Sequence, residues 1–417
     1  MTSRERVRAV LNPQTPDRIP NGLGGCETAG LHVIAYKKLQ ELLGLEKKPP
    51  RIGSFESNAV FELDVIKAME GDIVLIASPK LCKSDLRGPG VESQWKKQEL
   101  WGRPFLVSVE DEYNVEEDGA IVWKQGWRGG GPVIARPGSF FFDEPPGDLD
   151  LDKTDYPRPQ DVNPSHDWPD AELRRLEEIA RFMYNETDLS LSIGECLPDF
   201  QYLPGGFLKG WMFIAEYPDR MKEILSKMAD AALARLCLLD QALGNYVDMV
   251  NMAHDLGHNL GLFVGPEKFR EIYKPNYEKL FQGWKKISRM KCCLHSCGAI
   301  GEVLGDLVEC GLEIYNPVQI SGANMEPEYL KAAFGDVIFW GGAYDHHLCS
   351  PEESYESIYE KTSRNIKALA KDGGYIMSGV HNLLPEIPVR HLRAILDAWK
   401  DTRNYENITI HKGGIYA

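Results

Sequence analysis

From residue 170 onward, short apolar runs alternate with segments of helical periodicity, and this alternation constrains the fold more than any other feature. The apolar runs lie at 189–194, 247–252, 290–294, 314–318, 337–340 and 375–380. Because each run is apolar throughout, the pattern predicts parallel strands that are buried on both faces between helices. Two earlier runs, near Ile19 and at 73–77, bring the number of strands to eight. Eight βα units favour a closed (β/α)8 TIM barrel.

An open, doubly wound sheet is the competing architecture. It would carry a phosphate-binding glycine loop after its first strand, but residues 22–25 read GLGG and lack the G-x-G-x-x-G spacing. Residues 80–145 interrupt the alternation with weak helical periodicity and frequent Gly and aromatic residues, which predicts an inserted antiparallel β segment. We therefore predict one α/β barrel domain over residues 1–417, with a β-rich excursion at about 80–145. A long helical region is predicted at about 211–243.

The composition is that of an acidic globular chain. The 47 Lys and Arg against 62 Asp and Glu give a formal net charge of −15. Such a chain is repelled by nucleic acid and by anionic membranes, so neither is an expected partner. No uncharged stretch reaches the roughly 18 residues of a membrane span, and the charged amino terminus has no apolar signal core. The nine scattered cysteines predict reduced thiols and a cytoplasmic location.

His295 and Cys297 follow the apolar run at 290–294, at a predicted strand end where barrel enzymes carry their active residues. Being two positions apart, they face the same way on an extended backbone, with Cys293 one layer deeper. An imidazole and a thiolate side by side suit Zn²⁺. The alternative interpretation is a small buried cysteine beside a histidine that makes a hydrogen bond in the core.

His381 and Asn382 follow the run at 375–380 in the same way. A set of two imidazoles and one thiolate from His295, Cys297 and His381 would leave a fourth coordination position open, as in catalytic zinc sites. An equally weighted interpretation makes His381 a general acid or base, or a hydrogen-bonding partner of the substrate.

The other strand ends also carry polar residues. Asp255, after the run at 247–252, is expected to act as a base or to orient an imidazole. Glu195, after the run at 189–194, is expected to be a second catalytic carboxylate. The expected substrate contacts are His254, His258, Asn316, Gln319, Asp345 and Asn382. His346 and His347, which follow Asp345, are expected to be solvated or capping residues.

Four segments together resemble the uroporphyrinogen decarboxylase superfamily. Residues 1–20 are similar to its opening helix and Pro-Asp-Arg-Ile-Pro lead, and residues 254–275 to its Asp-Leu-Gly segment and following helix. The sequence LHSCGAI at 294–300 resembles its His-x-Cys-Gly strand end. The segment GGYIMSGVHNLLPEIPV at 373–389 is similar to its carboxy-terminal motif. The resemblance implies a (β/α)8 barrel with one of two chemistries.

One chemistry is cofactor-free decarboxylation of a tetrapyrrole, and the other is zinc-dependent methyl transfer to or from a corrinoid protein. The decarboxylases grip the substrate carboxylates with an Arg-rich segment after the first strand, whereas residues 21–28 here read NGLGGCET. A site for eight carboxylates without Arg is physically implausible. The methyltransferase branch implies zinc on a His-x-Cys pair, matched by His295 and Cys297, and on a late Cys, whose place His381 takes.

Three hypotheses follow from the sequence. The first is a zinc methyltransferase that moves a methyl group between a small methyl ether, methylamine or thiol and the cobalt of a corrinoid. The corrinoid would come from a partner protein, because the chain lacks an Asp-x-His-x-x-Gly motif. The second is a metal-free decarboxylase or lyase that acts on a small carboxylic acid with Asp255 and His381. The third is a non-catalytic protein that binds a corrinoid or tetrapyrrole.

Overall fold

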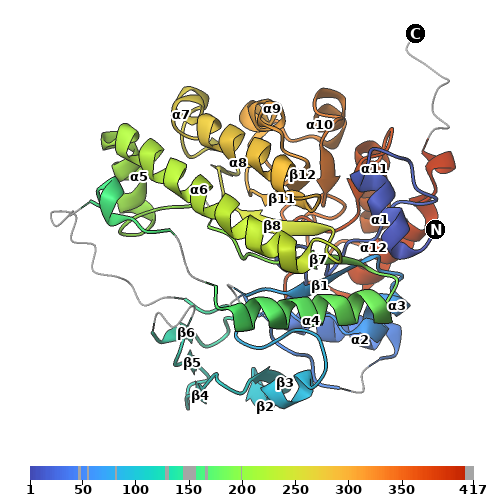
Figure 1. Cartoon of the computed structure of the whole chain (residues 1–417). Helices are drawn as coiled ribbons and strands as arrows, with labels where there is room; N and C mark the ends of the chain where they lie inside the picture. Colours follow the sequence, from blue (N-terminus) through green and yellow to red (C-terminus); the bar gives the residue numbers. More distant parts are fainter. Residues whose placement is uncertain are drawn as a thin grey trace, which may run out of the picture.

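The computed structural model of the protein describes residues 1–45, 48–53, 56–79, 82–126, 131–143, 156–164, 168–198 and 200–408. Twelve helices run through this part of the chain, and most of them surround a central sheet (Figure 1). They are α1 (Ser3–Leu11), α2 (Val33–Leu43), α3 (Leu63–Ala68), α4 (Asp170–Glu186), α5 (Phe207–Glu216), α6 (Pro218–Leu243), α7 (Pro266–Ile272), α8 (Lys274–Ile287), α9 (Gly301–Cys310), α10 (Pro327–Ala333), α11 (Tyr355–Leu369) and α12 (Val389–Thr402).

Seven parallel strands form the central curled sheet. In their order across the sheet they are β1 (Ile73–Ala77), β7 (Ser190–Ile193), β8 (Met249–Ala253), β11 (Lys291–His295), β12 (Ile314–Asn316), β13 (Ile338–Trp340) and β14 (Tyr375–Ile376). Each parallel strand is followed by helix before the next one begins, which is the arrangement that the alternation of apolar runs predicts.

The segment at residues 20–22 bridges the two edges of this sheet. The Gly22 N–H donates to the Met377 carbonyl at 2.8 Å, and the Met377 N–H donates to the Pro20 carbonyl at 2.9 Å. On the other side, the Asp72 N–H donates to the Asn21 carbonyl at 2.8 Å. The bridging segment therefore occupies the eighth strand position between β14 and β1. The fold is TIM-barrel-like, which confirms the predicted fold class.

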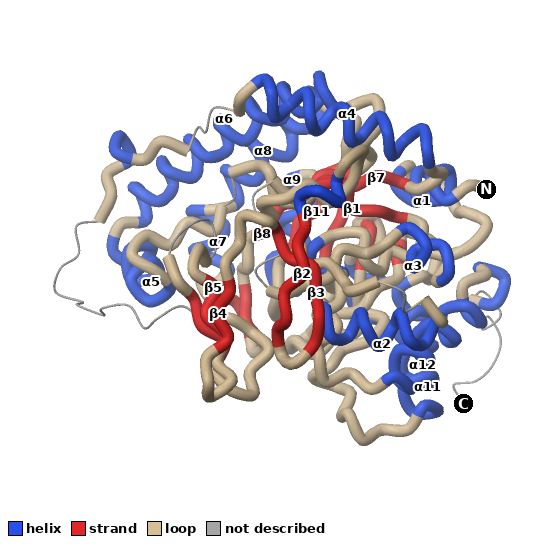
Figure 2. The backbone as a smooth tube through the Cα atoms, turned by 90° about the horizontal axis from the view of Figure 1, so that it is seen from below, coloured by secondary structure: helices blue, strands red, loops and turns tan. Residues whose placement is uncertain are grey.

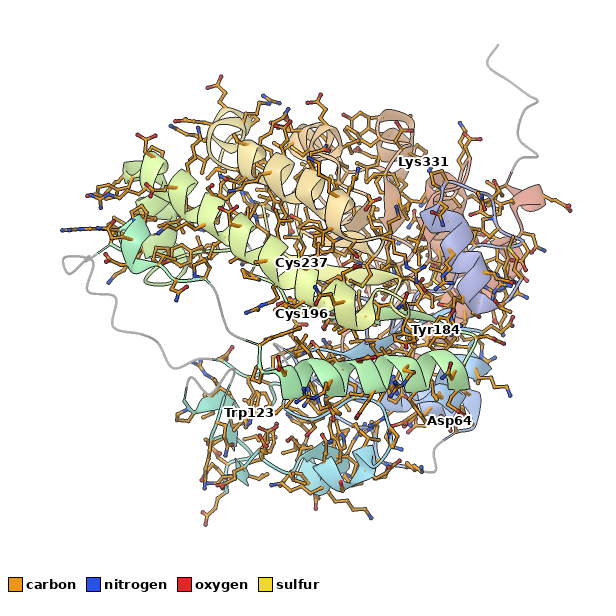
Figure 3. The ribbon with its side chains drawn as sticks, in the orientation of Figure 1. Asp64, Trp123, Tyr184, Cys196, Cys237 and Lys331 are labelled. Atoms are coloured by element: carbon orange, nitrogen blue, oxygen red, sulfur yellow. The ribbon has the colours of Figure 1, made fainter. Side chains whose placement is uncertain are left out.

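Helix α1 covers the amino-terminal end of the barrel. Its apolar side chains Val7, Val10 and Leu11 share one core with inward-facing strand residues such as Met249 and Cys293. The amino end of α1 is fixed by the Arg4 guanidinium, which lies 3.7 Å from the centre of the Tyr184 ring. Tyr184 stands at the end of α4 next to α1 in Figure 3. The other end of the barrel is left for the loops that follow the strands.

The long helical region predicted at 211–243 consists of two helices, α5 and α6. The break falls at Tyr217, whose backbone has φ −130° and ψ 56°, immediately before Pro218. Proline disfavours helical geometry in the residue before it and is well accommodated in the first turn of a new helix. The helical periodicity of the sequence continues across this junction. Pro218 is the residue that indicates where the first helix ends and the second begins.

Residues 95–135 contain five antiparallel strands outside the barrel sheet. They are β2 (Trp95–Leu100), β3 (Arg103–Ser108), β4 (Tyr113–Val115), β5 (Ile121–Trp123) and β6 (Val133–Ala135), in two small sheets seen separately in Figure 2. Their buried side chains, Trp123 among them (Figure 3), pack on Val33 and Ile34 of α2. Residues 80–81, 127–130 and 144–145 of the predicted excursion lie outside the described residues. The division into one domain with an insertion stays a prediction.

Asp72 connects α1, the bridging segment and β1 at the amino-terminal end of the barrel. Its fully buried carboxylate accepts from Arg6 Nη1 at 2.7 Å, from Arg18 Nη1 at 2.7 Å and from the Asn21 N–H at 2.8 Å. Both guanidinium groups are largely buried as well. Removing the carboxylate would leave two buried cations without this partner, which is the most costly way to break a buried ion pair.

We therefore expect Asp72→Ala to lower the free energy of unfolding by about 3–5 kcal/mol, measured by urea denaturation. Asp17→Asn is the matched control. Asp17 pairs with the same Arg6, but its carboxylate is 41% exposed, so its loss should cost about 1 kcal/mol or less. Equal effects of the two substitutions would contradict the central role of Asp72.

Candidate functional site

The loops at the carboxyl ends of the barrel strands bring the candidate residues into one region. His295 ends β11 and Asn316 ends β12, while Asp255 and His381 lie a few residues beyond β8 and β14. Because all of these strands are parallel, their carboxyl ends meet at one rim of the barrel.

The His295 ring is held in one orientation by Asn316. Asn316 Nδ2 donates to the Trp340 carbonyl at 3.0 Å, so the amide oxygen faces the other way. That oxygen lies 2.8 Å from His295 Nδ1 and also accepts from the Thr28 hydroxyl at 2.8 Å. An amide oxygen only accepts, so Nδ1 carries the proton. The lone pair of His295 is therefore on Nε2, free to bind a metal ion or to accept a proton.

Cys297 and His381 converge on that Nε2 atom. Cys297 Sγ lies 3.3 Å from His295 Nε2, and the centres of the His295 and His381 rings are 5.2 Å apart. One donor atom from each of the three residues lies within 4.8 Å of the others. The structure thus brings together the three side chains that the sequence analysis proposed as metal ligands. We call these three residues the HCH cluster.

The turn after β11 sets the position of Cys297. Its backbone N–H donates to Asp255 Oδ1 at 2.8 Å, and the next N–H, of Gly298, donates to Gln319 Oε1 at 2.7 Å. Gly298 has φ +92°, and a Cβ atom there would lie 2.2 Å from the carbonyl carbon of Gly257. Only glycine fits this close crossing of two loops.

Two carboxyl groups, those of Asp255 and Glu56, lie near the HCH cluster. Asp255 Oδ1 lies 3.7 Å from His295 Nε2. Burial, followed by the charges of Asp255 and Glu56, raises the pKa of the Cys297 thiol above its usual range. Burial also lowers the pKa of His381 to about 3, with a smaller contribution from His295. The thiol is protonated and the imidazole of His381 is neutral at pH 7, in a region of negative potential that favours a divalent cation.

Glu56 belongs to this region, and the sequence analysis missed it. Its Oε2 accepts from Asn382 Nδ2 at 2.6 Å and from Asn58 Nδ2 at 3.0 Å, and burial raises the pKa of its carboxyl group. Glu56 follows no strand, and nothing in the local pattern distinguishes it from a loop glutamate. The spatial link to Asn382 alone reveals it.

Glu195 follows β7 and lies next to a second buried carboxyl group, Glu27. Burial and the charge of Glu195 raise the pKa of Glu27 to about 7. The Ser78 hydroxyl donates to Glu27 Oε1, and a Cβ atom at position 194 would lie 1.5 Å from that oxygen. Gly194 is therefore needed for Glu27 to reach its place. Glu27 was not recognised in the sequence.

The structure differs from the sequence-based expectation at His254, where a substrate contact was predicted. It is 1% exposed, and its Nδ1 lies 2.6 Å from the Tyr277 hydroxyl of α8. Burial lowers the pKa of His254 to about 3. Alternate residues of a strand point to the same face. Val250 and Met252 face the helices, so the His254 ring, two positions further on, faces them as well.

The other expected substrate contacts lie at the rim, and most are held by protein partners. His258 is exposed in the hairpin of β9 (Gly257–His258) and β10 (Gly261–Leu262). Gln319 Nε2 donates to Asn259 Oδ1 at 2.7 Å, and Asn382 Oδ1 accepts from the Gly30 N–H at 3.0 Å. Asp345 Oδ2 accepts from the Ser321 N–H at 3.0 Å. Substrate contacts by these residues stay a prediction.

Comparisons with known proteins concern the family and the fold of the chain. Residues 205–402 match the family described as uroporphyrinogen decarboxylase (URO-D), which confirms the superfamily recognised from the sequence motifs. No curated protein matches the sequence.

Two solved structures are similar to parts or all of this chain. A methyltransferase from Methanosarcina mazei is similar with a TM-score of 0.54 and 14% identity, covering 96% of this chain and 99% of that chain. A glycoside hydrolase family 5 enzyme from Prevotella bryantii has a TM-score of 0.30 and 12% identity, covering 55% of this chain and 77% of that chain. The first likeness shows that the fold extends over nearly the whole chain.

The raised pKa of Glu27 predicts a specific dependence of stability on pH. Between its usual 4.5 and about 7, the folded protein keeps a proton on Glu27 that the unfolded chain has released. The folded state then binds more protons than the unfolded state, so stability falls as pH rises through this window. Above about pH 7, Glu27→Gln should be more stable than wild type by up to about 3 kcal/mol. Near pH 4 the two proteins should be similar.

Denaturant unfolding of both proteins across this range measures the difference directly. The contribution of every other titrating group cancels in that difference unless it contacts Glu27. Glu195→Gln should reduce the effect, because it removes the charge that helps to raise the pKa. Parallel stability profiles for wild type and Glu27→Gln would contradict the assignment.

Proposed function

We propose that the protein is a zinc-dependent methyltransferase that moves a methyl group between a small methylated molecule and the cobalt of a corrinoid carried by a separate protein. The observation that carries this proposal is the HCH cluster, whose donor atoms lie within 4.8 Å of one another at the barrel rim. The match of residues 205–402 to the uroporphyrinogen decarboxylase family supports an enzyme of this superfamily.

The residues of the cluster fit zinc. Two imidazoles and one thiol form a nitrogen and sulfur donor set that Zn²⁺ prefers, and three protein ligands leave one position for a substrate. His295 offers Nε2 because Asn316 holds the proton on Nδ1, the arrangement that orients metal-bound histidines in general. When bound, zinc would supply Lewis acidity that stabilises a negative charge on the heteroatom that loses or gains the methyl group.

The chain's own residues hold the ligands and handle protons. Asn316 fixes the His295 ring, and the Asp255 carboxylate fixes the Cys297 backbone. Asp255 is 34% exposed in its side chain and lies next to Nε2 of His295, so it is placed to take or give a proton at the substrate heteroatom. Glu195 lies next to Glu27, whose pKa is raised to about 7, and is the second carboxylate proposed for proton transfer. His258, Gln319 and Asn382 line the rim as proposed substrate contacts.

Decarboxylation of a tetrapyrrole fits this chain less well. The glycines after the first strand pack tightly: a Cβ atom at Gly22 would lie 2.5 Å from Trp340 Nε1, and one at Gly25 would lie 2.8 Å from Ile73 Cβ. An Arg at either position could not extend into the barrel without displacing these side chains. The glycines of this segment are instead packed closely against the Trp340 and Ile73 side chains.

The cysteines and the helices bear on the location of the protein. All nine cysteines are free thiols in the structure. We propose a reducing cytoplasm as the location of the protein. No helix in the described part of the chain has the length and apolar character needed to cross a bilayer. A small methylated molecule and a corrinoid protein are the proposed partners.

Metal content tests the proposal. We expect purified protein to hold about one zinc ion per chain, and Cys297→Ala or His381→Ala to lose it together with methyl transfer to free or protein-bound corrinoid. Cys237→Ala on α6 (Figure 3), far along the chain from the cluster, is the matched cysteine control and should keep the metal. Full activity in metal-free protein would overturn the proposal.

Asn316 gives a finer test, because its amide oxygen contacts His295 Nδ1 while Asn316 is not itself a proposed ligand. Asn316→Ala removes the acceptor for Nδ1–H and should weaken zinc binding by about 10–100-fold without removing a ligand. Chelator competition on the folded protein measures this affinity. Unchanged affinity in a variant that keeps its fold would show that Asn316 does not position the ligand.

A further inference from the structure

A second group of metal-binding side chains lies in the loop that follows β13. One donor atom from each of Asp345, His346 and His347 lies within 4.8 Å of the others. The His346 and His347 rings are 4.2 Å apart, and His347 Nδ1 lies 3.3 Å from Asp345 Oδ1. We propose that these three residues form a second binding site for a divalent transition-metal ion, separate from the HCH cluster.

The backbone holds this loop beside the HCH cluster. The Ala343 N–H donates to the Ser378 carbonyl at 2.9 Å, and the Val380 N–H donates to the Tyr344 carbonyl at 2.7 Å. These bonds continue the pairing of β13 with β14 beyond the strands themselves. Asp345 follows Tyr344 and His381 follows Val380, so these two side chains lie at the ends of paired segments. The two groups of metal-binding side chains are therefore neighbours at the rim.

Hydrogen bonds from backbone N–H groups hold the Asp345 carboxylate in one orientation, as they hold the carboxylate ligands of many metal sites. It is fully buried and accepts from the Ser321 N–H at 3.0 Å and from the His347 N–H at 2.9 Å. Each oxygen keeps a further lone pair, and backbone donors of this kind orient metal ligands in many sites. Asp345 therefore does more than end a turn.

His346 supplies the observation that a capping role leaves unexplained. The sequence analysis expected it to be solvated, but it is half-buried, and its Nδ1 has no hydrogen-bond partner among the described residues. A buried imidazole nitrogen without a partner is costly unless something binds there. Its neighbour His347 is 46% exposed in its side chain, so the site is open to solvent.

The donor set defines the chemistry of the ligand. Two imidazoles and a carboxylate without sulfur bind first-row divalent ions such as Fe²⁺, Co²⁺, Ni²⁺ and Zn²⁺. The HCH cluster contains a thiol and is softer. The two sites are therefore distinguishable by spectroscopy, because only the thiolate gives a strong sulfur-to-metal charge-transfer band.

Cobalt(II) titration of metal-free, full-length protein tests the inference. Equilibrium dialysis counts the bound ions, and the near-ultraviolet charge-transfer band reports the site that contains Cys297. We expect about two cobalt ions per wild-type chain and about one in His347→Ala and in His346→Ala, with the band intact in both variants. His258→Ala, a rim histidine outside both groups, is the matched control and should bind as many ions as wild type.

The outcome separates this proposal from the proposed function. If Cys297→Ala binds as many ions as wild type while His347→Ala loses one, the second site stands and the zinc methyltransferase proposal falls. If His346→Ala and His347→Ala bind as many ions as wild type, the second site is overturned. A wild-type chain that binds a single ion, lost only in Cys297→Ala, would overturn it as well.

Discussion

Closure of the barrel by three backbone hydrogen bonds is the constraint on which the site depends. The bonds of residues 20–22 to Met377 and Asp72 join the two edges of the parallel sheet. In a closed ring of parallel strands, every strand ends at the same rim, so residues far apart in sequence meet across it. His295 and His381 come from strands that are not neighbours in the sheet, yet their ring centres are 5.2 Å apart.

The two ends of the barrel differ in how their buried charges are paired. At the amino-terminal end, Arg6 and Arg18 neutralise the buried Asp72, and this end serves stability. At the carboxyl end, Asp255 and Glu56 face a thiol and two imidazoles with no Lys or Arg in ion-pair contact with Asp255 or Glu56 among the described residues. Uncompensated negative potential of this kind suits a cation-binding centre and costs folding stability.

The sequence predicted the features that follow from periodicity. Continuous apolar runs indicated parallel strands, and the spacing of two between His295 and Cys297 predicted that both side chains face the same way. The same alternation could have corrected His254, because Met249 faces the barrel interior while Val250 and Met252 face the helices. The expectation of a substrate contact at His254 did not take this alternation into account.

Other site residues could not be found from local patterns. Glu27 and Glu56 lie in irregular segments, and their burial is set by contacts with residues far along the chain. Glu56 is bound by Asn382, and Glu27 requires the missing side chain at Gly194. Such relations depend on how loops cross in space, and neither hydrophobic periodicity nor spacing encodes them.

X-ray absorption at the zinc edge, on protein loaded with one equivalent of zinc, tests the central claim most directly. The account predicts a coordination shell with one sulfur at about 2.3 Å and nitrogen or oxygen atoms at about 2.0–2.1 Å. The sulfur should disappear in the Cys297→Ala protein. A shell made only of nitrogen and oxygen in the wild-type protein would contradict the claim that His295, Cys297 and His381 hold the ion.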